Sequence, residues 1–125
     1  DTAKGIGRAF FLNRGKRLSR VVINKSTVPI GSGNWIEMLI REEIRRQFIQ
    51  SPRGNGSQSN KESLEEIFQT FTVVSNPEFL REGSAISDTF YPDRIVVGTG
   101  SESAMQVLRK LYELIITQNF TPPPF

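Results

Sequence analysis

The sequence predicts an α/β fold in which helices flank a mostly parallel sheet. Two observations support this prediction. Short β-branched runs alternate with longer segments of helical periodicity. The 125 residues suffice for one domain, and their hydrophobic content of 37% and charged content of 23% are ordinary for a globular domain.

The first half of the chain contains two predicted helices and one predicted strand. Residues 3–12 carry apolar side chains at helical spacing, and the run 21–23 is β-branched and bounded by polar residues, as a buried strand is. Residues 34–49 give the clearest helix. Its apolar side chains recur every four residues, at Ile36, Ile40, Ile44 and Phe48. Residues 51–60 contain no apolar side chain, so we expect a flexible surface insertion, followed by a short helix.

The second half continues the alternation of strands and helices. Strands are expected near 71–75 and 94–98, and both should join the strand near 20–24 in one sheet. Residues 102–117 predict the last helix, with Thr99 at capping-box spacing before it. The predicted core stripe of this helix consists of Ala104, Val107, Leu108, Leu111 and Ile115.

The composition narrows the possible chemistry. The absence of cysteine and histidine excludes disulfides, thiolate sites and histidine bases within these residues, so we expect no metal site. No run approaches the ~18 apolar residues of a membrane span, and no signal-peptide pattern opens the chain. Six basic side chains fall within residues 1–20, but no aromatic residue interleaves with those at 14–20. We therefore expect a cytoplasmic protein that binds neither membranes nor nucleic acid.

Two polar segments follow predicted strands, where ligands of such sheets bind. In the first, at 25–29, a hydroxyl can orient a water or a cofactor amide, or it can cap the next helix, and the residues alone leave both open. The second is SNPEFLREG at 75–83. The glycine pairs at 31–33 and 98–100 lack the third glycine of a dinucleotide fingerprint, so we interpret them as turns that lead into helices.

The second polar segment allows two interpretations of its glutamates. Pro77 suits the first turn of a helix and Asn76 suits its cap, which would place Glu78 and Glu82 on one helical face. Such a pair can perform acid–base chemistry if its pKa values are pushed apart. It can also be two solvated side chains that compensate the helix dipole, and spacing alone favours this second interpretation.

Two segments closely resemble the UDP-glucose/GDP-mannose dehydrogenase family. They are VVINKSTVPIG at 21–31 and VVSNPEFLREGSAISDTFYPDRIVVG at 73–98, and SESAMQVLRKLYELI at 101–115 is also similar to that family. The resemblance implies a partial Rossmann-like fold. Residues 1–125 would form the C-terminal part of the NAD-binding domain, with an insertion at 51–60. The family's glycine fingerprint would precede these residues, and its catalytic cysteine, lysine and asparagine would follow them.

The resemblance also implies roles for individual residues. Family members oxidise the C6 alcohol of a sugar to a carboxylate in two NAD-dependent hydride transfers, linked by a covalent thiohemiacetal on a cysteine. Ser26, Thr27 and Val28 would line the NAD cleft, and Thr27 would also hold a catalytic water. Glu78 would serve in acid–base chemistry, and Glu82 would reach the nicotinamide side and bind the cofactor. The implied substrate contacts are Glu78, Phe79, Leu80, Arg81 and Glu82.

The ending YPDRIVVG of the second motif resembles the UDP-glucose branch more than the GDP-mannose branch. We therefore expect a fragment of a UDP-glucose 6-dehydrogenase, which forms UDP-glucuronate, is inactive alone and belongs to a homo-oligomer when intact. Two alternatives stay open. One is a fragment of a GDP-mannose 6-dehydrogenase, and the other is a non-catalytic binding or assembly module on the same fold.

Overall fold

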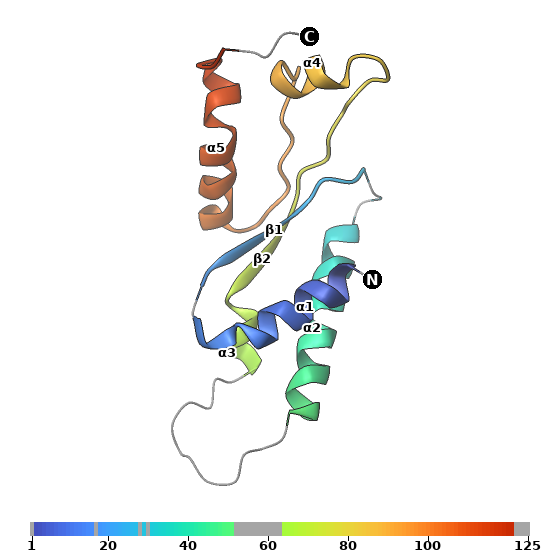
Figure 1. Cartoon of the computed structure of the whole chain (residues 1–125), viewed down its shortest axis with the longest axis vertical. Helices are drawn as coiled ribbons and strands as arrows, with labels where there is room; N and C mark the ends of the chain where they lie inside the picture. Colours follow the sequence, from blue (N-terminus) through green and yellow to red (C-terminus); the bar gives the residue numbers. More distant parts are fainter. Residues whose placement is uncertain (1, 17, 28, 30, 52–63, 122–125) are drawn as a thin grey trace. The chain divides into compact units, whose positions relative to one another are not determined.

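The computed structural model describes residues 2–16, 18–27, 29, 31–51 and 64–121. Helices and two strands alternate along the chain (Figure 1). In order, the elements are α1 (Thr2–Leu12), the 3₁₀ turn η1 (Arg14–Lys16), β1 (Arg20–Asn24), α2 (Ser32–Gln50), α3 (Leu64–Phe68), β2 (Phe71–Ser75), α4 (Ala85–Phe90) and α5 (Glu102–Thr117).

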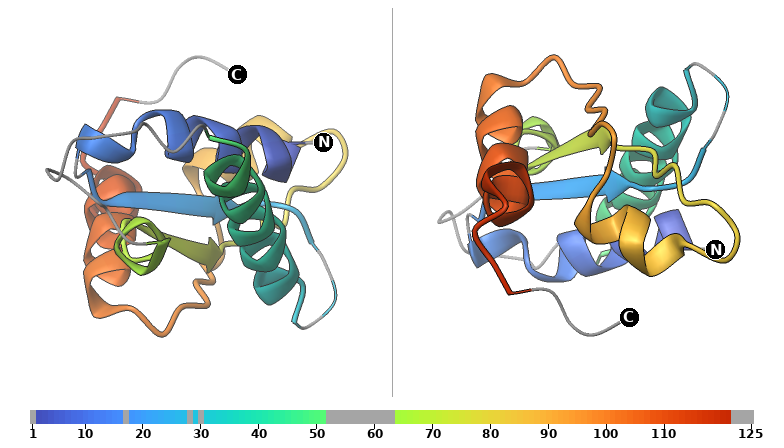
Figure 2. Two further views of the ribbon diagram at one scale, coloured as in Figure 1. Left: turned by 90° about the horizontal axis from the view of Figure 1, so that it is seen from below. Right: turned by 90° about the horizontal axis from the view of Figure 1, so that it is seen from above.

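Strands β1 and β2 pair in parallel, and their arrows point the same way in both panels of Figure 2. Backbone hydrogen bonds continue the pairing at both ends, from Arg20 N to Thr70 O (2.8 Å) and from Asn76 N to Asn24 O (2.9 Å). The chain divides into two compact units, one formed within Asp1–Val22 and Ile30–Val73 and the other within Ile23–Pro29 and Val74–Phe125. Each strand therefore contributes residues to both units.

The first unit has its core where α1 crosses α2 (Figure 1). Gly7 permits this close crossing, because a Cβ atom there would lie 2.8 Å from the Ile40 carbonyl oxygen. Glu43 on α2 is buried, and hydrogen bonds from Arg46 and Gln47 lower its pKa to about 2. The buried apolar side chains of this core are Ala3, Phe11, Ile40, Ile44, Ile67, Phe68 and Phe71.

In the second unit, α5 occupies the residues predicted for it. Ala104 and Leu108 are buried, as expected. Val107 and Leu111 were predicted to join them, but their exposed fractions are 49% and 59%. The part of α5 that the described residues bury is thus narrower than the apolar stripe predicted from the sequence. The cap also differs from the prediction, because Ala104 N donates to Ser101 Oγ (3.3 Å).

The prediction of a third strand at 94–98 is wrong. The only pairing there is an isolated antiparallel bridge between Gly98 and Ser75, within the part of the chain that the structure describes. Two neighbours of Ser75 explain why the pairing goes no further. Pro77 has no N–H to donate, and the Asn76 side-chain amide takes the Val96 carbonyl (2.8 Å), which a ladder would otherwise use.

The predicted helices at 3–12, 34–49 and 102–117 are confirmed as α1, α2 and α5. Helix α2 starts earlier than expected, directly after Gly31, whose φ of 93° ends the preceding loop. Most of the predicted insertion at 51–60 lies outside the described residues. Among the helices that the structure describes, none is long and apolar enough to cross a membrane.

Candidate active site

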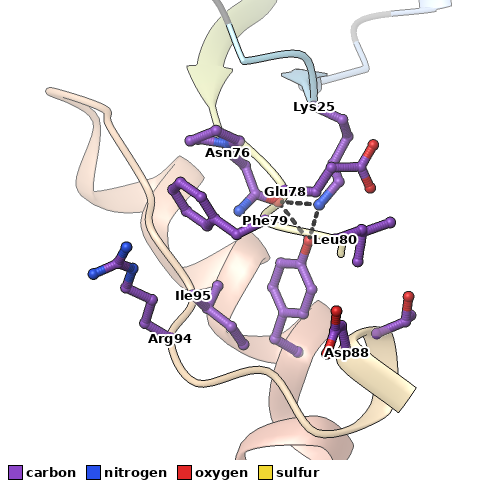
Figure 3. A pocket seen from close by; sticks show the side chains of 11 residues that line it. Lys25, Asn76, Glu78, Phe79, Leu80, Asp88, Arg94 and Ile95 are labelled. Atoms are coloured by element: carbon purple, nitrogen blue, oxygen red, sulfur yellow. Dashed lines mark hydrogen bonds between the residues drawn. The ribbon is translucent and has the colours of Figure 1, made fainter. Parts of the chain in front are cut away.

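A pocket of about 260 Å³ opens in the second unit, beyond the carboxyl ends of β1 and β2. Its walls come from the loop after β1, the segment after β2, helices α4 and α5, and the stretch between them (Figure 3). The lining residues include Lys25, Asn76, Glu78, Phe79, Leu80 and Tyr112. This location is the one that parallel α/β sheets favour for ligands.

The first polar segment is a loop that leaves β1 at Asn24. Ser26 and Thr27 are both exposed on it, and Ser26 N donates to the Asn24 side-chain oxygen (3.3 Å). Thr27 Oγ1 donates to the backbone oxygen of Glu78 at 3.5 Å. The loop therefore lies beside the second polar segment. Val28, the third residue expected to line the cofactor cleft, lies outside the described residues.

The second segment has no helix or strand at residues 76–81, so the prediction of a helical turn there is wrong. A residue that precedes proline disfavours helical geometry, which applies to Asn76. The backbone amides also have other acceptors, because Asn76 N bonds to Asn24 O and Glu78 N bonds to Lys25 O at 3.3 Å. Glu78 and Glu82 therefore do not share a helical face.

The predicted substrate contacts are exposed side chains on this segment. Phe79 and Leu80 have exposed fractions of 47% and 42%, and both line the pocket with Glu78. The guanidinium of Arg94 lies 5.0 Å from the centre of the Phe79 ring, a distance typical of a cation–π contact. Glu82 is exposed in the turn that precedes α4 and is not among the pocket-lining residues.

Asp88 on α4 fixes the end of this segment. Its carboxylate accepts hydrogen bonds from Arg81 Nη2 (2.6 Å), from the Arg81 backbone N–H (2.8 Å) and from Ser84 Oγ (3.1 Å). These bonds, and above all those from the Arg81 side chain, hold the pKa of Asp88 well below its usual range. Gly83, with φ of 81°, makes the turn between the two partners.

Sequence reasoning missed Lys25, Asp88, Arg94 and Tyr112 as parts of the pocket. Lys25 is the first residue of the KSTVP motif, and this position could have indicated that it belongs to the pocket. Asp88 and Tyr112 gave no such signal, because they meet the motifs only through the fold. Among the described residues, no group of His, Cys, Asp and Glu side chains is placed to hold a metal ion.

The loop after β1 fits one end of a dinucleotide cofactor. It offers the exposed hydroxyls of Ser26 and Thr27, and the buried Asn24 Nδ2 beside them has no hydrogen-bond partner among the described residues. A buried donor of this kind favours a polar ligand group or a bound water. The 125 residues contain no complete glycine fingerprint for the diphosphate, so the fit is limited to that end of the cofactor.

Comparison with known proteins decides the family. Residues 9–116 match the NAD binding domain of the UDP-glucose/GDP-mannose dehydrogenase family. The chain belongs to this family. The match contains both polar segments of the pocket.

Individual family members give the scale of the similarity. The chain is 40% identical over 92 residues to UDP-glucose 6-dehydrogenase YwqF of Bacillus subtilis and 43% identical over 94 residues to UDP-glucose 6-dehydrogenase of Rhizobium meliloti. Each match covers 74% of this chain but only 16% of the relative. The chain thus spans about one sixth of the length of these curated relatives.

Solved structures of family members share the fold. A UDP-glucose dehydrogenase from the archaeon Pyrobaculum islandicum aligns with a TM-score of 0.62 and 34% identity, over 90% of this chain and 21% of that one. A GDP-mannose dehydrogenase from Pseudomonas aeruginosa, solved as a ternary complex, aligns with a TM-score of 0.60 and 26% identity, over 90% and 22%. These neighbours bear out the Rossmann-like α/β fold class expected from the sequence.

Proposed function

We propose that this chain forms one wall of the active site of an NAD-dependent nucleotide-sugar 6-dehydrogenase that oxidises UDP-glucose to UDP-glucuronate. The observation that carries the proposal is the meeting of the two motifs beyond the parallel strands. Thr27 Oγ1 lies 3.5 Å from the Glu78 backbone oxygen, next to a pocket that Glu78, Phe79 and Leu80 line.

The chemistry assigned to the chain is proton handling and positioning. NAD, when bound, supplies the acceptor for the hydride that leaves C6 of the sugar. In the proposal, the Glu78 carboxylate takes the hydroxyl proton, directly or through a water that the Thr27 hydroxyl orients. Ser26, Thr27 and Val28 line the cofactor side, and Glu82 faces the nicotinamide.

The substrate side of the proposal rests on the exposed PEFLRE segment. Phe79 and Leu80 offer apolar surface to the sugar, and Glu78 contacts its reacting end. Arg81 already gives Nη2, Nε and its backbone N–H to Asp88. Its side chain is nevertheless 75% exposed, so it retains guanidinium surface for a phosphate or hydroxyl of the ligand.

We propose UDP-glucose rather than GDP-mannose as the substrate. The two curated relatives described above are UDP-glucose 6-dehydrogenases, and the solved UDP-glucose dehydrogenase is 34% identical to this chain, against 26% for the GDP-mannose enzyme. GDP-mannose remains the second candidate, because the GDP-mannose enzyme aligns almost as well in three dimensions. The proposal also includes a homo-oligomeric complete enzyme and a cytoplasmic location, where nucleotide sugars and NAD are available.

Turnover of a complete dehydrogenase that carries these residues tests the proposal. Residues 9–116 replace the corresponding segment of the Bacillus subtilis relative, and the absorbance of reduced NAD is followed with each nucleotide sugar. We expect two NAD reduced per UDP-glucose consumed and little reduction with GDP-mannose.

Three outcomes of this experiment are informative. If the chimera prefers GDP-mannose, the proposed substrate becomes GDP-mannose. If the chimera folds but binds neither NAD nor a nucleotide sugar, the result supports a non-catalytic module. The 125 residues alone should give no turnover, because they hold no cysteine nucleophile. Sustained NAD reduction by the purified 125 residues would contradict that part of the proposal.

A further inference from the structure

Three side chains from distant parts of the sequence form a closed hydrogen-bonded triangle at the pocket. Lys25 follows β1, Asn76 follows β2, and Tyr112 belongs to α5. Lys25 Nζ donates to Tyr112 Oη at 3.0 Å and to Asn76 Oδ1 at 3.3 Å. The Tyr112 hydroxyl donates to the same Asn76 oxygen in a short hydrogen bond. Figure 3 shows Lys25 and Asn76 pointing toward each other.

The triangle uses both lone pairs of the Asn76 side-chain oxygen. Asn76 is buried, with an exposed fraction of 1%. Its oxygen has two lone pairs, which accept from Lys25 and Tyr112, while its amide nitrogen donates to Val96 O at 2.8 Å. Removing such a hydrogen bond from a buried amide destabilises the folded protein. The orientation of Asn76 is therefore fixed by partners from three separate segments.

Beyond the hydrogen bond from Asn76 N to Asn24 O (2.9 Å), the direct contacts between the two motifs are long. Glu78 N to Lys25 O and Lys25 Nζ to Asn76 Oδ1 each measure 3.3 Å, and Thr27 Oγ1 to Glu78 O measures 3.5 Å, all beyond the usual range for hydrogen bonds. The two shorter sides of the triangle are the bonds of Tyr112. The triangle contains a cationic donor, and hydrogen bonds to charged groups are roughly twice as strong as neutral ones. The bonds from Tyr112 thus restrain the loops that carry Thr27 and Glu78 more than the long contacts between these loops do.

We propose that Lys25 and Tyr112 are positioning residues that fix the distance between the Thr27 hydroxyl and Glu78. This inference rests on the proposed dehydrogenase function. Lys25 stands two residues before Thr27, and Asn76 stands two residues before Glu78. The triangle therefore fixes the position at which each of the two segments begins. Tyr112 braces it from α5, which is anchored by the buried Ala104 and Leu108. Loss of the Tyr112 hydroxyl lets the two segments separate without altering the pocket's own reacting groups.

The test compares Tyr112→Phe with Tyr91→Phe in the complete dehydrogenase described above. Tyr112→Phe removes one oxygen but keeps the ring, which lies 5.6 Å from Lys25 Nζ. Tyr91→Phe is the matched control, because it makes the same change at a tyrosine whose ring centre lies 6.0 Å from that of Phe120 and which is not among the pocket-lining residues. We expect Tyr112→Phe to lower kcat by about 10-fold or more, since small displacements of reacting groups are costly, with a much smaller change in KM.

Two further readouts separate positioning from general stability. Hydrogen exchange of the amides of Asn76 and Glu78, measured without ligands, should be faster in Tyr112→Phe than in Tyr91→Phe. In a double-mutant cycle, the variant that combines Lys25→Met with Tyr112→Phe should have a kcat no lower than that of the slower single variant. The reason is that each substitution alone already breaks the same triangle. Fully additive losses would contradict the inference.

The outcomes distinguish this inference from the proposed function. An unsubstituted chimera that folds but does not reduce NAD with a nucleotide sugar would defeat the proposed function. Exchange at Asn76 and Glu78 would then still test the triangle. If the chimera is active and Tyr112→Phe matches Tyr91→Phe in both kcat and exchange, Tyr112 is not a positioning residue.

Discussion

At the scale of single residues, the pairing of Arg81 with Asp88 holds the end of the second polar segment in place. Asp88 has an exposed fraction of 9%, and it accepts both side-chain and backbone hydrogen bonds from Arg81. The contact runs across the turn at 82–84, from a residue outside any helix to one inside α4, so it follows no helical or strand period. The sequence could therefore not predict this contact, and only the resemblance to the family implied a role for Arg81 as a substrate contact.

Replacing Asp88 by asparagine should loosen the turn before α4. The variant loses the carboxylate charge that hydrogen bonds from Arg81 and Ser84 stabilise, so we expect a lower Tm and faster exchange at the Arg81 amide. Asp93→Asn is the control, since it removes the same charge from an exposed side chain nearby. Thermal unfolding and hydrogen exchange measure the difference between the two variants.

The effect of Asp88→Asn should depend on pH in a defined direction. Folding lowers the pKa of Asp88 below its ordinary value of 3.8. The ionised carboxylate therefore stabilises the folded protein above pH 3.8, and this stabilisation is lost as the pH falls further. The Tm difference from the unsubstituted protein should thus be constant near neutral pH and shrink below about pH 4. A difference that grows on acidification would contradict the assignment of the ionised carboxylate as the acceptor.

At the scale of secondary-structure elements, periodicity predicted the long helices but not the irregular segments. Helices α2 and α5 follow from apolar side chains repeated over about three turns, a pattern that helical geometry requires. The irregular segment at 76–81 and the unpaired stretch at 94–97 depend instead on tertiary hydrogen bonds. Asn76, predicted to cap a helix, instead donates to Val96 and accepts from Lys25. Such long-range competition for polar groups cannot be detected in sequence patterns.

The crossing of α1 and α2 gives a test of packing. An added Cβ at Gly7 would lie 2.8 Å from Ile40 O and 2.9 Å from the Glu43 Cβ, so Gly7→Ala must push the helices apart. We expect a loss of about 1–3 kcal/mol in the free energy of unfolding, the usual cost of overpacking. Chemical denaturation measures it.

Gly5 provides the matched control on the same helix. A Cβ there meets no atom within 4 Å, so Gly5→Ala should gain up to about 1 kcal/mol from helix propensity. Equal effects of Gly5→Ala and Gly7→Ala would show that the two helices do not approach closely at Gly7.

At the scale of the whole molecule, both polar motifs belong to the second compact unit, although Thr27 and Glu78 are 51 residues apart in sequence. Their meeting was predictable, because parallel strands bring their carboxyl ends to one edge of the sheet. The roles of Glu78 and Glu82 came only from resemblance to the family. The partners Lys25 and Tyr112 are 87 residues apart and became visible only in the folded chain.

The most direct test of the central claim is the turnover of Glu78→Gln in the complete dehydrogenase, measured with UDP-glucose and NAD. Glu113→Gln is the control, because Glu113 is exposed on α5 and is not among the pocket-lining residues. If Glu78 handles the proton, Glu78→Gln should slow turnover by ~10²-fold or more, the scale of a lost acid–base group. Its Tm should change little, since Glu78 is exposed. Turnover of Glu78→Gln equal to that of Glu113→Gln would contradict the account.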